Sequence, residues 1–227
     1  MKNTENIISI IRKQGIIPLF YHDDLTVCIE VIDALYKAGI RVVEYTNRGK
    51  KAINNIEALI QTREQRWSEL LLGVGTIKTA EQVKNFIAAG ADFIICPGVL
   101  PEVAKATQSA GLLWVPGCMT PTEIMVAEQS GARLVKLFPG SLLSPSYVSA
   151  VKEIFPDLMF MPTGGVDVSE ENIGAWFKAG VCAVGLGSKV ISKELMKRKD
   201  YGTIGALAKK ALMITRKIKS QIRHVND

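Results

Sequence analysis

The stretch AAGADFIICPG, residues 88–98, contains the unit on which the fold assignment rests. Gly90 stands where a left-handed residue would end a helix, and a short apolar run over residues 92–96 follows it at once. Pro97 and Gly98 then break that run. The pattern predicts a helix, a tight connection and a buried strand in direct succession.

The same order of elements recurs along the chain. An Ala-Gly or Ser-Gly pair, followed by a small or apolar residue, precedes an apolar run at residues 38–40, 89–91, 110–112, 130–132 and 179–181. The expected strands are residues 16–20, 41–45, 70–74, 92–96, 112–115, 133–138, 158–161 and 181–184. Helical periodicity with plausible end signals is seen in residues 24–38, 79–89, 121–129 and 170–178.

Strands that alternate with helices favour an α/β fold with parallel pairing through right-handed crossovers. Eight such units predict a closed (β/α)8 TIM barrel. An open doubly wound sheet is the alternative, but no G-x-G-x-x-G follows the first expected strand. Since no linker or low-complexity stretch interrupts the pattern, we expect residues 1–227 to form a single domain with a basic C-terminal helix.

The composition is that of an ordinary globular protein. Of the 227 residues, 48% are hydrophobic and 22% are charged, which argues against a disordered or fibrous chain. No apolar run approaches the roughly 18 residues needed to span a bilayer. Residues 1–15 lack the apolar core of a secretory signal, so we expect a cytoplasmic protein with no membrane partner.

Cysteine and histidine are too sparse for the common metal sites. The four cysteines, Cys28, Cys96, Cys118 and Cys182, form no C-x-x-C pair, and the chain has only two histidines. We therefore expect neither a metal site nor a disulfide framework, and no cofactor.

The net charge of +6 is concentrated at one end of the chain. From residue 196 onward there are nine Lys or Arg residues against two acidic residues, so the rest of the chain carries a net charge of −1. The simplest interpretation is a solvated helix face, and contact with nucleic acid or a membrane surface is the alternative. No aromatic side chains alternate with these cations, so we expect no nucleic-acid partner.

Two expected strands contain a charge where a barrel strand is normally apolar. In RVVEYTNR (41–48), the alternation of a strand places Glu44 on the inner face and Val43 and Tyr45 on the helix side. In RLVKLFPG (133–140), the same alternation points Lys136 inward. Burial of a charge is costly, so two inward charges on different strands indicate a functional pair.

Each of these charges has a structural and a chemical interpretation. Lys136 could extend to the barrel rim, or desolvation could leave it as an uncharged amine that acts as a Schiff-base nucleophile. Glu44 could form a structural ion pair with Lys136 or Arg48, or could act as a general base at the carbon next to an iminium.

A second group of residues is suited to an anion. PTGGV (162–166) and GLGS (185–188) follow the seventh and eighth expected strands, where barrels often bind phosphate through backbone N–H groups. The candidates are Thr163, Gly164, Gly165, Gly187 and Ser188; alternatively, the glycines only make tight turns. Thr76, which follows the third strand, could bind a carboxylate or serve as a cap.

Seven segments, in order and at matching spacing, resemble the 2-keto-3-deoxy-6-phosphogluconate (KDPG) aldolase family, which includes 4-hydroxy-2-oxoglutarate (KHG) aldolases. The segments are EYTNR (44–48), GVGT (73–76), CPG (96–98), PGCMTPTE (116–123), VKLFPG (135–140), PTGGV (162–166) and GLGS (185–188). The resemblance spans about residues 7–215.

The resemblance implies a class I aldolase without a metal. It implies that Lys136 is the Schiff-base lysine and Glu44 the general acid/base. Arg48 and Thr76 would hold the carboxylate of the pyruvyl part of the substrate, and Pro97 and Phe138 would pack against that part. The two glycine-containing loops would bind the phosphate, and the protein would form a homotrimer.

The expected reaction is cleavage of KDPG to pyruvate and glyceraldehyde 3-phosphate. Cleavage of KHG to pyruvate and glyoxylate is a further activity that the resemblance leaves open. The galactonate epimer of KDPG is an alternative substrate. Two other classes remain open: a sugar-phosphate isomerase that uses only the phosphate loops, and a binding module that acts through the basic C-terminal helix.

Overall fold

A computed structural model describes residues 3–226 of the chain, with side chains described up to residue 222. Residues 1, 2 and 227 of the expected domain, and the Arg223 side chain of the basic segment, lie outside this description. The strands are β1 (Ile16–Phe20), β2 (Val42–Thr46), β3 (Leu71–Gly75), β4 (Phe93–Ile95), β5 (Leu113–Val115), β6 (Gly117–Cys118), β7 (Leu134–Leu137), β8 (Met159–Pro162) and β9 (Val184–Leu186).

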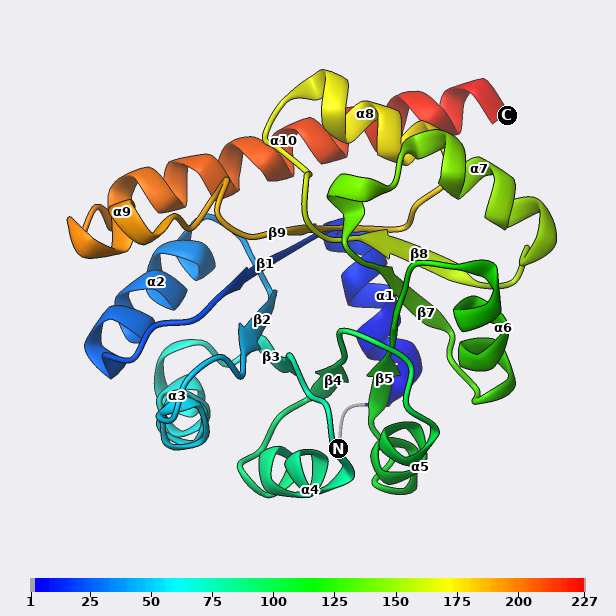
Figure 1. Cartoon of the computed structure of the whole chain (residues 1–227). Coiled ribbons are helices and arrows are strands. Elements are labelled where there is room, and N and C mark those ends of the chain that lie inside the picture. Colours follow the sequence, from blue (N-terminus) through cyan, green and yellow to red (C-terminus); the bar gives the residue numbers. More distant parts are fainter. Residues whose placement is uncertain (1–2, 227) are drawn as a thin grey trace.

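Helices follow the strands and surround them (Figure 1). They are α1 (Thr4–Gln14), α2 (Leu25–Lys37), α3 (Ala52–Arg66), α4 (Ala80–Ala88), α5 (Pro101–Ser109), α6 (Pro121–Gln129), α7 (Pro145–Ile154), α8 (Glu170–Lys178), α9 (Lys193–Lys197) and α10 (Tyr201–Asn226), with a 3₁₀ turn η1 (Gly140–Leu142).

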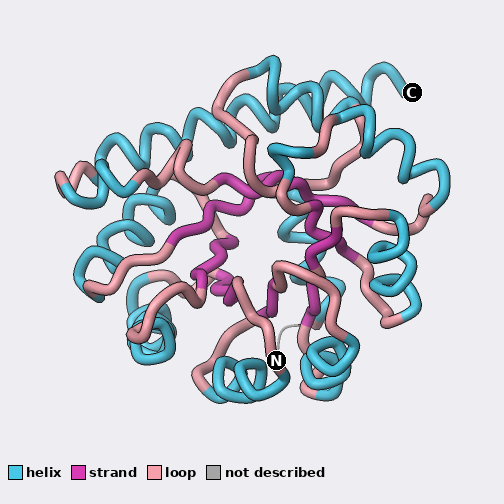
Figure 2. The backbone as a smooth tube through the Cα atoms, in the orientation of Figure 1, coloured by secondary structure: helices cyan, strands magenta, loops and turns pink. Residues whose placement is uncertain are grey.

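The strands form a ring of parallel neighbours (Figure 2). One part has the order β5-β4-β3-β2-β1-β9, and the other has the order β6-β7-β8. A parallel bridge between Thr163 and Gly185 joins β8 to β9, while β6 continues from β5 after Pro116. The expected closed barrel is confirmed, with the fifth strand in two pieces.

The eighth strand differs from its sequence-based prediction. Residues 181–184 were expected to form it, but β9 begins at Val184, opposite Ile16 of β1. The Val181 N–H instead donates to the carbonyl of Trp176 at the end of α8 (3.4 Å). The apolar run therefore starts as the closing turn of a helix and becomes a strand only three residues later.

The glycines predicted to end helices do so. Gly39, Gly90, Gly111, Gly131 and Gly180 all have φ between 72° and 99°. A left-handed residue lets the chain turn from helix to strand at once, and glycine adopts it without steric cost. These turns set where each following strand enters the ring.

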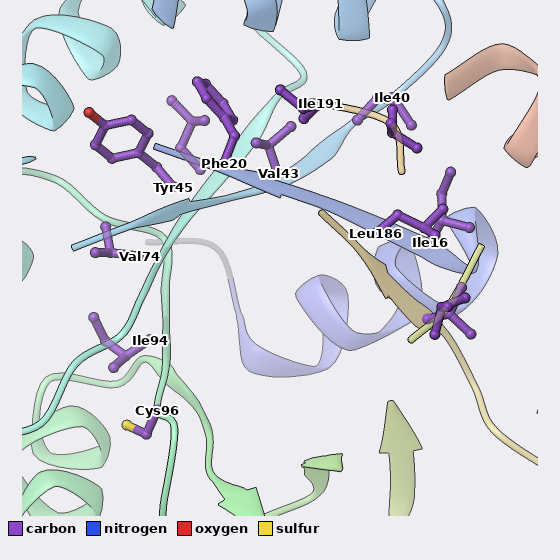
Figure 3. Close-up of a cluster of buried hydrophobic side chains, with 14 of the residues drawn as sticks. Ile16, Phe20, Ile40, Val43, Tyr45, Val74, Ile94, Cys96, Leu186 and Ile191 are labelled. Atoms are coloured by element: carbon purple, nitrogen blue, oxygen red, sulfur yellow. The ribbon is translucent and has the colours of Figure 1, made fainter. Parts of the chain in front are cut away.

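Buried apolar side chains divide into two clusters, as alternation along buried strands requires. Val43, Tyr45 and Val74 pack outward with helix residues in the cluster of Figure 3. A second cluster occupies the inside of the ring: Ile17, Val42, Leu71, Phe93, Ile95, Leu113, Val115, Leu134, Met161 and Ala183. Helix α1 adds Ile7, Ile8 and Ile11 to the inner cluster and so covers one end of the barrel.

The basic C-terminal segment is two helices rather than the one that was expected. Helix α9 ends at Lys197, Lys199 takes a left-handed φ of 55°, and α10 begins at Tyr201. The Asp200 carboxylate accepts a hydrogen bond from the N–H of Thr203 (3.0 Å) and caps the new helix. No helix in the described part of the chain is long and apolar enough to cross a membrane.

Candidate active site

Lys136 and Glu44 meet inside the ring. The Nζ of Lys136 donates to Oε1 of Glu44 at 3.3 Å and to Oε2 at 3.5 Å. Only 5% of Lys136 and 1% of Glu44 is exposed. Both side chains point inward, as the strand alternation predicts, and neither reaches bulk solvent.

The strands hold these two groups by their register. Glu44 lies on β2 opposite Gly73 of β3, while Lys136 lies on β7 opposite Met161 of β8. Two residues earlier on the same strands, Val42 and Leu134 belong to the apolar inner cluster. The charged pair therefore sits on an apolar layer, toward the carboxyl ends of the strands, where barrel enzymes carry their active sites.

Phe138 lies beside the amine. Its ring centroid is 5.4 Å from Nζ of Lys136, within the range of a cation–π contact. The ring continues the inward row of β7 after Leu134 and Lys136. It supplies an apolar surface next to the group that would react.

Thr76 stands at the end of β3 in an unusual backbone conformation, with φ of 64°. Threonine is β-branched, so a left-handed φ is a true outlier for it. The chain is tied on both sides: the Gly75 carbonyl accepts from the N–H of Asn47 (2.8 Å), and the N–H of Ile77 donates to Ile95 (3.3 Å). Strain of this kind is concentrated at binding and catalytic sites.

The other residues expected around the pyruvyl part of the substrate lie at the ends of neighbouring strands. Arg48 is exposed and comes two residues after β2, and Pro97 is half-buried and comes two residues after β4. No ion pair of Arg48 is found among the described residues. Its guanidinium is thus available to an anion from outside the barrel.

The two glycine-containing loops are adjacent, because Thr163 and Gly185 form a parallel bridge. Gly164 and Gly165 have φ of 90° and 76°, the left-handed backbone conformation that glycine adopts without steric cost. Gly187 is half-buried and Ser188 is exposed. Thr163 is 4% exposed, and its hydroxyl has no hydrogen-bond partner among the residues that the structure describes. A hydroxyl of this kind can still hydrogen-bond to a ligand atom or a water molecule.

Two residues near the site were not among the candidates. Thr46 is fully buried two residues after Glu44, and its hydroxyl donates to the Phe20 carbonyl (3.2 Å). The Gly140 N–H donates to the Thr163 carbonyl (2.8 Å), which joins the loop after β7 to the phosphate-loop candidate. Strand alternation places Thr46 on the same inward face as Val42 and Glu44, so this residue could be found from the sequence. No local sequence pattern indicates the contact of Gly140.

The cysteine nearest this pair is a poor nucleophile. Burial raises the pKa of Cys96 to about 12, although Trp114 and Lys136 act in the opposite direction. Burial also raises the pKa of Cys118 to about 12. In the described part of the chain, no three His, Cys, Asp or Glu side chains form a group that could hold a metal ion.

A parallel barrel that holds a buried amine beside a carboxylate, toward the carboxyl ends of its strands, has the layout of a TIM-barrel enzyme. Sequence comparison then gives the family. Residues 7–207 match the family model described as KDPG and KHG aldolase. The chain belongs to this family and is an aldolase, a carbon–carbon lyase.

Two curated relatives act on different epimers by name. The chain is 30% identical to the 2-dehydro-3-deoxy-phosphogluconate aldolase of Haemophilus influenzae, over 93% of this chain and 97% of that protein. It is 32% identical to the 2-dehydro-3-deoxy-6-phosphogalactonate aldolase of Escherichia coli, over 69% of this chain and 75% of that protein. These relatives establish the family and leave the substrate open.

Solved structures agree with the fold. The KDPG aldolase of Legionella pneumophila, captured with pyruvate as a covalent carbinolamine, has a TM-score of 0.81 and 29% identity, with 90% of this chain and 97% of that chain covered. The tryptophan synthase α subunit of Legionella pneumophila has a TM-score of 0.73 at 16% identity, covering 96% of this chain and 99% of that chain. The second likeness concerns the fold alone.

Proposed function

We propose that this chain is a class I aldolase that cleaves KDPG to pyruvate and glyceraldehyde 3-phosphate, with Lys136 as the Schiff-base nucleophile. The observation that carries the proposal is the buried contact between Nζ of Lys136 and Oε1 of Glu44, at 3.3 Å. At this distance the carboxylate can accept a proton from the ammonium directly. The transfer leaves a carboxylic acid and a neutral amine, the form of lysine that can attack a carbonyl carbon.

The neutral amine attacks the C2 carbonyl of the substrate and forms a carbinolamine. Glu44 then returns its proton to the hydroxyl that leaves as water, and a protonated iminium results. Phe138, next to Nζ, and Pro97 would pack against the pyruvyl carbons. Arg48 and Thr76 would bind the carboxylate and so orient C2 toward Lys136.

Glu44, again a carboxylate, takes the proton from the C4 hydroxyl. The C4 oxygen forms an aldehyde as the C3–C4 bond breaks, and the bond electrons pass to the iminium, which becomes a neutral enamine. After the aldehyde leaves, Glu44 returns the proton to C3. Glu44, once more a carboxylate, takes a proton from the water that adds to the new iminium, and the neutral carbinolamine then breaks down to pyruvate and the free amine of Lys136.

The phosphate of the substrate would bind to the adjacent loops after β8 and β9. Backbone N–H groups of Gly164, Gly165 and Gly187, with the hydroxyls of Ser188 and Thr163, are suited to an anion. Thr163 supports this proposal because its buried hydroxyl has no hydrogen-bond partner among the described residues.

Trapping with borohydride tests the mechanism. Incubation with pyruvate and borohydride should reduce the iminium and leave a stable adduct on the peptide that contains Lys136. Lys136→Ala should not be labelled, and Lys178→Met, at an exposed lysine outside the site, should be labelled like the wild type. Equal labelling of Lys136→Ala and the wild type would reject the mechanism.

The substrate is tested by measuring pyruvate release from three compounds side by side: KDPG, its galactonate epimer and KHG. The proposal expects the highest kcat/KM for KDPG. It also expects a much lower value for KHG, which has no phosphate for the loops after β8 and β9. Preference for the galactonate epimer would change the substrate and retain the Schiff-base chemistry.

We also propose that the protein forms a homotrimer, as the resemblance to the family implies. Two of the most exposed large apolar side chains, Leu142 (69%) and Ile154 (65%), lie at η1 and the end of α7, where a subunit contact could cover them. Light scattering during size-exclusion chromatography should give three times the chain mass of 24.8 kDa. A monomer mass would reject the trimer.

A further inference from the structure

We infer that Gly75 is a positioning residue for the reaction: its missing side chain keeps the space in which the Glu44 carboxylate lies beside Lys136. The inference rests on the proposed function. It assigns a chemical consequence to a residue that has no side chain of its own.

The contact is steric and close. A Cβ atom placed on Gly75 would lie 1.8 Å from Oε1 of Glu44, 2.6 Å from its Cδ and 2.8 Å from its Cγ. All three distances are below 3.0 Å, and Cβ atoms in real proteins essentially never lie that close to a heavy atom of another residue. A methyl group at position 75 therefore cannot coexist with the present position of the carboxylate.

Strand register explains why this glycine meets this carboxylate. Thr46 lies opposite Gly75 in the β2–β3 pairing, and Glu44 lies opposite Gly73. Gly73 and Gly75 share the inward face of β3. The place of the Gly73 side chain is filled by the Phe93 ring, 2.1 Å from a Cβ at that position. Gly75 therefore provides the space next to β3 that remains for the carboxylate.

The backbone at Gly75 does not itself require glycine. Its φ is outside the left-handed range, unlike that of Gly164 and Gly165. Its carbonyl accepts from Asn47, a contact that alanine would retain. The effect of a methyl group at position 75 should therefore pass through Glu44 rather than through the strand.

A small displacement of the carboxylate is enough to affect the chemistry. Oε1 and Oε2 are 3.3 and 3.5 Å from Nζ of Lys136, already at the long end of hydrogen bonding. Because Glu44 is 1% exposed, it has no solvent into which to move. Proton transfer requires hydrogen-bond reach, so a shift away from β3 should impair every step that uses Glu44.

The first experiment compares Gly75→Ala with the wild type and with Gly202→Ala, a control at an exposed position of α10 where the nearest atom to an added Cβ, apart from the helix's own backbone, is 3.9 Å away. We expect Gly75→Ala to lower kcat for pyruvate release by about 10²–10⁴-fold, the usual contribution of general acid–base catalysis. KM should change much less, and Gly202→Ala should match the wild type. Wild-type kcat in Gly75→Ala would overturn the inference.

The second experiment repeats Gly75→Ala in the Glu44→Ala background. With the carboxylate removed, the added methyl group should cost no further kcat, and the decrease in Tm that it causes in the wild-type background should largely disappear. An equal fractional loss of kcat or an equal decrease in Tm in both backgrounds would show that Gly75 does not act through Glu44.

The two proposals fail in different ways. If the wild type releases no pyruvate and is not labelled by borohydride, the proposed function is wrong, but the Tm comparison still tests the contact between positions 44 and 75. If the wild type is active and the two substitutions are additive in kcat and Tm, only the role of Gly75 is rejected.

Discussion

Lys136 is buried, and its Nζ contacts the Glu44 carboxylate and the Phe138 ring. A buried pair of this kind contributes little to stability compared with apolar residues of similar size. Its presence in the middle of a barrel therefore supports the chemical role proposed for it.

The first prediction concerns the stability of this pair. Lys136→Met should lower the free energy of unfolding by about 3–5 kcal/mol, because it leaves the Glu44 carboxylate buried without its partner. Urea unfolding at neutral pH measures the change. The double variant Lys136→Met/Glu44→Leu should recover much of the loss, and Lys178→Met should be close to the wild type. An undiminished stability in Lys136→Met would show that the carboxylate is not held as described.

At the residue scale, alternation was sufficient to predict that Lys136 and Glu44 point into the barrel. The rows Val42-Glu44-Thr46 and Leu134-Lys136 face inward because a strand has a period of two and both faces of a barrel strand are buried. The distance between Lys136 and Glu44 could not be predicted in this way, since it depends on how residues 92 positions apart meet across a closed ring.

The first turn of α6 has a capping box that the sequence indicated through its Thr and acidic residue. The Thr120 hydroxyl accepts from the Glu123 N–H, while the Glu123 carboxylate accepts from the N–H groups of Met119 (2.6 Å) and Thr120 (2.8 Å). Partial burial tends to raise the pKa of Glu123, but these hydrogen bonds outweigh it and hold the pKa below its ordinary value of 4.5.

The second prediction follows from the sign of this shift. Because the folded-state pKa of Glu123 is lower than the unfolded value, its stabilisation is complete above the unfolded pKa and is lost as pH falls through the folded pKa. Glu123→Gln should therefore be less stable than the wild type at pH 7, and the difference should shrink in acid. Urea unfolding across this pH range measures it, with Glu128→Gln, at an exposed position on the same helix, as control. A difference that does not depend on pH would contradict the assignment.

Element boundaries were harder to predict than the elements themselves. An apolar run such as residues 181–184 has no internal mark that separates the closing turn of a helix from the start of a strand. Pairing with β1 decides the boundary, and pairing is not local. The break between α9 and α10 had a usable signal, since Asp200 precedes Thr203 as an N-cap residue does.

On the scale of the whole molecule, α1 closes the barrel at the end away from the Lys136–Glu44 pair. Ile7 and Ile11 are fully buried and belong to the cluster inside the ring. The other helices fit a pattern in which helices alternate with strands, whereas α1 precedes β1 and completes no β/α unit. This explains why counting eight units predicted the ring but gave no expectation of the helix that covers it.

The third prediction tests this cover. Ile11→Ala should lower the free energy of unfolding by about 2–5 kcal/mol, because it leaves a cavity in the apolar cluster inside the barrel, where α1 covers its end. Its kcat should remain that of the wild type, since the charged pair lies on the other side of the inner apolar layer. Ser9→Ala, at an exposed position of the same helix, should change stability by less than about 0.5 kcal/mol. If the fall in kcat, expressed as a free energy, were as large as the fall in stability, the packing of α1 and the Lys136–Glu44 pair would not be independent.

The formation of an enamine on Lys136, with Glu44 moving the proton at C3, is best tested by exchange of the methyl hydrogens of pyruvate in D₂O, followed by proton NMR. The wild type should replace these hydrogens by deuterium, Lys136→Met should not catalyse the exchange, and Glu44→Gln should be slower by about 10²–10⁴-fold. Undiminished exchange in folded Lys136→Met would contradict the mechanism, because no other described residue is assigned to form the enamine.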